Sequence, residues 1–396
     1  MKPFWHAMAN WQGTFRSGLY PLWLIGANLM ARVGGMVILI LIGHSFSQDQ
    51  LGTYFQILAM VGLAVTATQA GSGPLLVRLA QDRAFHAALK FVALRILMAL
   101  IASILVIWAT RLPVTQFWPL ILIPFAAALA PDWMIAAKTR FAQMAVIAVS
   151  GQICGILIAV LAALTHSSIA LYFVAPAISV ASLVLAAFFA FGAYSHTDIK
   201  ATITTASASP PVDKGLASGL IGFTLLSGAL PNLDFVLLGT ENDTLFLAQR
   251  IFLFCAGLIT AVASTLFAKQ QTGRLRDIWL LLPMVLVSGV LLAFPGILAG
   301  IVYAAPSDGL IDVLQTGAVW PLLLAVITRQ ILILQETSLF RWIGWCCLLL
   351  MVVSALCLPS GMPATGIMGL ITARLGCLAV ILLACRKFAP DRQVAA

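Results

Sequence analysis

Residues 20–43 read YPLWLIGANLMARVGGMVILILIG, an apolar run long enough to cross a bilayer as one α-helix. Asn28 and Arg32 interrupt it, and no small-residue cleavage site follows, so we expect an uncleaved first span. Similar runs recur as far as Phe388. The chain of 396 residues is 62% hydrophobic and 9% charged, against about 25% charged in soluble chains. The composition therefore predicts an all-α polytopic membrane protein and excludes a large soluble domain.

Polar clusters divide the chain into about twelve candidate helices. They are expected near residues 20–43, 51–77, 88–109, 117–137, 141–164, 168–194, 215–239, 244–268, 278–303, 309–332, 339–358 and 363–386. The predicted organisation is an N-lobe at 19–194 and a C-lobe at 215–388, flanked by a cytoplasmic segment at 1–18, a linker at 195–214 and a tail at 389–396. Segment 1–18 has apolar residues at helical spacing beside Lys2 and Arg16, which favours an amphipathic helix on anionic membrane lipids, with a frayed tail as the alternative.

The basic residues define an orientation. With the N-terminus in the cytoplasm, seventeen Lys and Arg residues fall on that side of the membrane and only Arg111 falls on the other. Both termini are then cytoplasmic, and we expect the protein in the bacterial inner (plasma) membrane. The net charge of +9 is explained by this bias and predicts no nucleic-acid partner.

An internal repeat is indicated when the chain is shifted by 196 residues, because Ile42-Gly43 then aligns with Leu238-Gly239 and the apolar runs stay in register. Two similar apolar helices aligned by chance are the alternative. Six spans in each half return the chain to its starting side, so the halves form a parallel repeat of two six-helix lobes around a central cavity. In this register Gly34 and Gly35 align with Pro231, which predicts a hinge in each lobe or, alternatively, packing glycines and a kink.

Several motifs resemble the polysaccharide-export flippases of the multidrug/oligosaccharidyl-lipid/polysaccharide (MOP) exporter superfamily. The similar stretches are Ala27 through Arg32 to Gly43, Gln50-Leu51-Gly52-Thr53-Tyr54, Gly71-Ser72-Gly73-Pro74, Leu76-Val77-Arg78-Leu79-Ala80 and Leu233-Asp234-Phe235-Val236-Leu237-Leu238-Gly239. They cover helices one, two, seven and eight, and some members of that family have fourteen helices. The resemblance implies alternating access that moves an undecaprenyl-pyrophosphate-linked oligosaccharide from the cytoplasmic to the periplasmic leaflet. Polysaccharide polymerases and glycosyltransferases are the partner proteins of such a pathway.

Six ionisable residues lie at membrane depth, where each costs about 2.5–3.5 kcal/mol and is retained when paired, hydrated or useful. Asp234 and Arg250 lie at similar depth in one hairpin, and Arg95 and Asp132 lie near the cytoplasmic end of another. Each pair is expected to be a structural ion pair, or else a site of proton or sodium coupling.

Arg32 and Arg374 are different, because each falls near mid-span and neither adjoining hairpin helix offers an acid at that depth. A guanidinium presents a planar fork that matches phosphate, so both are candidates to contact an anionic head group in the cavity. Bonding to backbone carbonyls or to Asn28 is the alternative.

The sequence contains no visible catalytic constellation, so we expect neither an enzyme nor a cofactor. The five histidines are isolated and the seven cysteines lie in apolar runs, which predicts no metal site and no disulfide framework. The phosphate-binding pattern G-x-x-x-x-G-K-[ST] does not occur. A flippase for a lipid-linked oligosaccharide is therefore the first hypothesis. A small-molecule or drug extruder of the same superfamily is the second, and a membrane enzyme or assembly subunit is the third.

Overall fold

The computed structural model describes residues 20–69, 72–81, 84–110, 112–138, 140–193, 232–239, 242–268, 274–334 and 361–388. The predicted segments 1–18, 195–214, 339–358 and 389–396 and the hinge candidate Pro231 lie outside these residues. Within them every regular element is an α-helix, as a bilayer requires, because a helix satisfies its own backbone hydrogen bonds.

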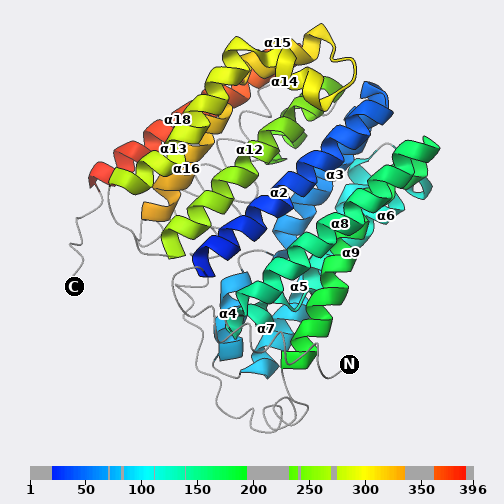
Figure 1. Cartoon of the computed structure of the whole chain (residues 1–396), viewed down its shortest axis with the longest axis vertical. Helices are drawn as coiled ribbons and strands as arrows, with labels where there is room; N and C mark the ends of the chain where they lie inside the picture. The colour runs from blue at the N-terminus through cyan, green and yellow to red at the C-terminus, as the bar shows by residue number, and fades with distance from the viewer. Residues whose placement is uncertain are drawn as a thin grey trace.

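The helices fall into two lobes. The N-lobe holds α2 (Tyr20–Ser45), α3 (Gln48–Gln69), α4 (Ser72–Gln81), α5 (Phe85–Ala109), α6 (Val114–Leu129), α7 (Asp132–Ala137), α8 (Phe141–Thr165) and α9 (Ser168–Ala193). The C-lobe holds a helical stretch at 232–238, then α12 (Asp243–Ala268), α13 (Arg274–Ala293), α14 (Pro295–Val302), α15 (Asp308–Thr316), α16 (Trp320–Leu334) and α18 (Ala364–Phe388). In Figure 1 the blue-to-green N-lobe and the lime-to-red C-lobe stand side by side, with α2 and α12 in contact between them.

The protein is a multi-pass membrane protein. Among the described residues, seven helices are long and apolar enough to cross a membrane, or eight if the bent pair α13–α14 is one span. Large apolar side chains such as Trp108, Leu157 and Phe191 point outward, where a soluble protein would expose polar groups but a bilayer supplies hydrocarbon. Prolines inside α6, α9 and α13 are tolerated because neighbouring membrane helices help satisfy the freed carbonyl groups.

One of the predicted spans is sharply bent and another is divided into two helices. The expected helix at 278–303 is not one straight crossing, because α13 and α14 meet at 96°. The break falls at Phe294, directly before Pro295, whose ring cannot donate a backbone hydrogen bond. The span predicted at 51–77 is divided into α3 and α4, whereas those predicted at 117–137 and 309–332 each remain one apolar span despite short breaks between α6 and α7 and between α15 and α16.

The first and seventh helices turn at the same end of the molecule. α2 is followed by α3, the stretch 232–238 is followed by α12, and Gly52 near the start of α3 packs against Asp243 at the start of α12. The two hairpins therefore run in the same direction, as the parallel repeat predicts.

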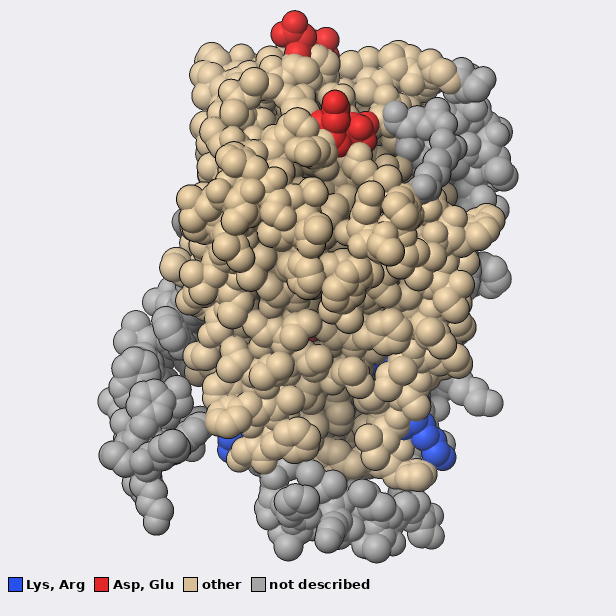
Figure 2. Space-filling view, turned by 90° about the vertical axis from the view of Figure 1, so that its right-hand side faces the viewer, with Lys and Arg blue, Asp and Glu red and all other residues tan. Residues whose placement is uncertain are grey.

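Charges separate between the two ends of the bundle. One end, here called the acidic end, carries Asp49, Asp243, Asp308 and Asp312 in the first turns of α3, α12 and α15 or close by. The opposite basic end carries Arg78, Lys90, Lys138 and Arg140. Figure 2 shows acidic side chains at one end, basic ones at the other and an uncharged surface between them. This separation is the one expected of a chain oriented by its basic residues.

Candidate functional site

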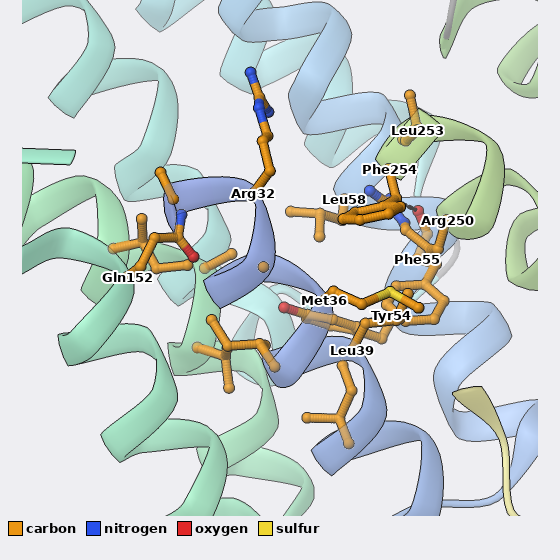
Figure 3. Close-up of a pocket in the computed structure, with 17 residues that line it drawn as sticks. Arg32, Met36, Leu39, Tyr54, Phe55, Leu58, Gln152, Arg250, Leu253 and Phe254 are labelled. Carbon is orange, nitrogen blue, oxygen red and sulfur yellow. Dashed lines mark hydrogen bonds between the residues drawn. The ribbon is translucent and has the colours of Figure 1, made fainter. Parts of the chain in front are cut away.

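A pocket of about 240 Å³ lies where the N-lobe helices α2, α3, α8 and α9 meet α12 of the C-lobe. Its lining is mainly apolar and aromatic, with Tyr54, Phe55 and Phe254 among its walls. Two arginines, Arg32 and Arg250, also line it, one from each lobe (Figure 3). The pocket therefore combines an apolar surface with positive charge at the seam between the lobes.

Arg32 projects from the middle of α2 into this seam. Its side chain lies against Gly257 of α12, and a Cβ added at Gly257 would come within 3.0 Å of the Arg32 Cδ and Nε atoms. The Arg32 side chain is exposed, and among the described residues its guanidinium has no hydrogen bond or ion pair. A full guanidinium charge at membrane depth is thus available to a ligand.

Arg250 is held differently. Its Nη2 donates a hydrogen bond of 2.7 Å to the backbone carbonyl oxygen of Phe55, and its guanidinium carbon lies 4.9 Å from the centroid of the Phe55 ring. Phe55 belongs to α3 of the N-lobe and Arg250 to α12 of the C-lobe. The predicted ion pair between Arg250 and Asp234 is therefore wrong.

Asp234 instead forms an ion pair with Arg374, within the C-lobe. Their side chains are 1% and 7% exposed, so the pair is buried between the stretch 232–238 and α18. Arg374 does have an acid at its depth, which corrects the expectation that it lacks one. Hairpin neighbours could not reveal this partner, because the two residues come from the first and last helices of the lobe. The neighbouring Gln249 side chain donates to Asn232 at 3.1 Å, a second polar link inside the C-lobe.

The second predicted pair lies near the basic end. Arg95 is buried and its Nε donates to the Ser72 hydroxyl at 2.7 Å, where α3 gives way to α4. Asp132, which is exposed at the start of α7, lies close enough to interact with Arg95 electrostatically. The structure thus brings the two residues near each other but gives Arg95 a hydroxyl as its direct partner.

The glycine pair in α2 contributes close packing. A Cβ added at Gly34 would lie 2.9 Å from Cβ of Gln152 on α8, and Gly35 lines the pocket. α2 continues through both glycines as one helix. Gly34 therefore serves as a packing residue here, and a hinge at Gly34–Gly35 stays a prediction.

The lobes are also joined at the acidic end. The Ala304 amide donates to the Gly43 carbonyl at 3.3 Å, and the Gln48 side chain donates to the Ala305 carbonyl. Gly43 packs directly on the backbone of Val302, where a larger residue would collide. The loop after α14 therefore closes the seam above the pocket on the acidic side.

The described residues contain no group of three or more His, Cys, Asp or Glu side chains that could hold a metal ion. Sequence reasoning missed two features of the pocket, the close approach of Gly257 to Arg32 and the Phe55 carbonyl that binds Arg250. A backbone acceptor carries no sequence signal. Gly257 does carry one, since a glycine inside an apolar span often marks a close approach.

Fold and site together define a class: an α-helical multi-pass membrane protein of two lobes with a cationic pocket at the seam. No protein-family model matches the chain, and no curated protein matches it in sequence. Solved structures share its fold. An outward-facing multidrug resistance MATE family transporter of the MOP superfamily gives a TM-score of 0.58 at 15% identity, covering 92% of this chain and 95% of that one.

Two further MATE structures give the same result. The crystal structure of a MATE mutant has a TM-score of 0.55 at 13% identity and covers 92% of this chain and 96% of that chain. A crystal structure of MATE in the bent conformation has a TM-score of 0.50 at 13% identity, with 94% and 98% covered. The chain therefore has the fold of the MATE transporters along nearly its whole length.

Proposed function

We propose that this protein is an alternating-access transporter that moves an undecaprenyl-pyrophosphate-linked oligosaccharide from the cytoplasmic to the periplasmic leaflet. The observation that carries the proposal is the Arg32 guanidinium, which lies on the wall of a pocket between two lobes and has no partner among the described residues. An isolated charge at membrane depth is costly, so its retention favours a ligand of opposite charge. Pyrophosphate matches a guanidinium because its oxygens accept two parallel hydrogen bonds.

The pocket also suits a sugar attached to that phosphate. Gln152 lines it, and the Gln152 side-chain oxygen is buried without a hydrogen-bond partner among the described residues. Such an oxygen accepts readily from a sugar hydroxyl. Tyr54 and Phe55 add aromatic surface to the same pocket. In this proposal Arg374 does not contact the cargo, because Asp234 already neutralises it.

In this proposal the acidic end faces the periplasm, and the structure represents a state whose seam is closed on that side. The C-lobe pair Asp234–Arg374 remains available for proton or sodium coupling only if the arginine releases the carboxylate.

Extrusion of small organic molecules is the second candidate. It is favoured by the apolar lining and by the multidrug resistance transporter among the structural neighbours. The two arginines of the pocket disfavour cationic compounds, so the compounds exported would be neutral or anionic.

Deletion of the gene in its host distinguishes the two. We expect lost surface polysaccharide, together with lipid-linked oligosaccharide that accumulates in the cytoplasmic leaflet and is inaccessible to an impermeant periplasmic glycosidase. Re-expression of the wild-type chain should restore both. Unchanged polysaccharide with increased sensitivity to toxic compounds would instead identify an extruder.

A further inference from the structure

Arg250 ties the two lobes together through a single guanidinium. Its bond to the Phe55 carbonyl crosses the seam, and the Phe55 ring lies beneath the charge. A hydrogen bond from a charged donor is stronger than one between neutral groups, and burial strengthens it further. Arg250 therefore contributes to holding α12 against α3.

The same guanidinium faces the pocket. Arg250 is a lining residue, and its Nε atom is buried without a hydrogen-bond partner among the described residues. Nε and Nη2 form the side-on fork through which arginine binds phosphate in a bidentate manner. Nη2 is the atom that now donates to Phe55. A phosphate that engages this fork competes directly with the bond across the seam.

If Arg250 exchanged the Phe55 carbonyl for a phosphate, no acceptor would be left without a hydrogen bond. The Phe55 carbonyl lies inside α3, where it also accepts the ordinary intrahelical bond from the residue four positions later. Without the bond from Arg250, the Phe55 carbonyl has the hydrogen bonding of an ordinary helix carbonyl. A phosphate oxygen carries charge whereas the carbonyl is neutral, so the phosphate is the stronger acceptor.

Among the described residues, Arg250 makes a hydrogen bond between the lobes that a ligand in the pocket can reach. Two other bonds that join the lobes, from Ala304 to Gly43 and from Gln48 to Ala305, lie at the acidic end and involve no residue of the pocket lining. Arg32, on the opposite wall, would attract the same anion.

We propose that Arg250 is an anion-released latch: it holds the seam closed by binding the Phe55 carbonyl, and a phosphate group in the pocket draws it away and allows the lobes to separate. The inference rests on the proposed anionic cargo. In this inference a single side chain links occupancy of the pocket to whether the lobes are closed against each other.

The test measures the distance between the lobes directly. The seven cysteines are replaced by alanine, and spin labels are placed at Thr165→Cys on α8 and Gly309→Cys on α15. Both positions are exposed, and a Cβ at Gly309 meets no atom within 4 Å. Double electron–electron resonance is recorded on the full chain in lipid nanodiscs, in sodium chloride and in inorganic pyrophosphate at equal ionic strength.

We expect one short distance in chloride and a growing population at longer distance in pyrophosphate. Arg250→Met should raise the open-to-closed ratio in chloride by about tenfold, the loss expected of a charged hydrogen bond, and should respond little to pyrophosphate. Arg250→Lys should stay closed in chloride and require more pyrophosphate to open, because it keeps the charge but loses the fork. Lys90→Met, which removes an exposed charge at the basic end, should behave as wild type.

Two results would overturn the latch. If Arg250→Met and Arg250→Lys both give wild-type distances in chloride and wild-type responses to pyrophosphate, the latch is wrong while an anionic cargo survives. If Arg250→Met opens the seam but pyrophosphate moves neither protein, then release by an anion is wrong, and the proposed cargo loses its support as well.

Discussion

Arg32 and Arg374 look alike in the sequence, since each is an arginine near the middle of an apolar helix. Their surroundings in the two lobes are nevertheless different. In the C-lobe, Arg374 is buried and paired with Asp234. In the N-lobe, Arg32 faces the seam and has no partner among the described residues. Depth in the membrane thus does not decide the role of a charge. The helix across from it decides, and Arg32 lies opposite a glycine.

The largest effect is expected at the buried pair. Arg374→Ala should destabilise the fold by about 3–5 kcal/mol, because it leaves the carboxylate of Asp234 buried and unpaired. Thermal unfolding of the purified protein in detergent, followed by size-exclusion recovery, measures the loss. The double variant Asp234→Asn with Arg374→Gln should recover much of the stability, since neither group is then charged. An unchanged midpoint in Arg374→Ala would show that the pair is dispensable.

Arg32→Ala should have the opposite profile. We expect its free energy of unfolding to remain within about 0.5 kcal/mol of wild type, because no partner of Arg32 among the described residues would be left unpaired. Export of surface polysaccharide should nevertheless be lost, and Arg32→Lys should restore only part of it because a point charge lacks the bidentate fork. Normal polysaccharide in cells carrying Arg32→Ala at wild-type protein levels would remove this residue from the cargo site.

Gly257 offers a way to disturb Arg32 without altering any charge. Gly257→Val should displace the arginine side chain, since even a Cβ would lie 3.0 Å from its Cδ and Nε, and should reduce export at a cost of about 1–3 kcal/mol in stability. Gly376→Ala on α18 is the matched control, because a Cβ there meets no atom within 4 Å. Export equal in the two variants would mean that the placement of Arg32 is irrelevant.

The smallest effect is expected in the N-lobe counterpart of the buried pair. Asp132→Asn should cost less than about 1 kcal/mol, because Asp132 is exposed and the direct partner of Arg95 is the Ser72 hydroxyl. Asp234→Asn should cost several times more in the same unfolding assay. Equal losses would contradict the difference between the lobes.

The sequence predicts the fold better than it predicts the site. Long apolar runs and the distribution of basic residues are properties of single segments, so they predict the helices, the parallel hairpins and the charged ends. The break at Phe294-Pro295-Gly296 also had a local signal, because Pro-Gly steps favour turns.

Ion-pair partners that lie across the lobe from each other carry no such local signal in the sequence. Asp234 and Arg374 are 140 positions apart (374 minus 234), and reasoning from adjacent hairpins assigned Asp234 to Arg250 instead. The sequence marks Arg250 as a charge at membrane depth, but its acceptor is a backbone oxygen that every residue type possesses. The apparent absence of a neighbouring acid selected Arg32 and Arg374 alike, although only Arg32 is without a partner among the described residues.

The bend between α13 and α14 has a mechanical consequence. α14 turns 96° away from α13, and Phe294, Ile297 and Ile301 around it are 50% exposed or more. An apolar face on a short helix that turns sharply away from its neighbouring span is suited to rest in the layer between headgroups and acyl chains. The C-lobe would then keep a fixed depth in the bilayer, and any rocking of the lobe would move α14 through lipid. The rate at which the C-lobe rocks should consequently vary with the acyl-chain length of the lipid. It should be fastest where the hydrocarbon thickness matches the span of α13.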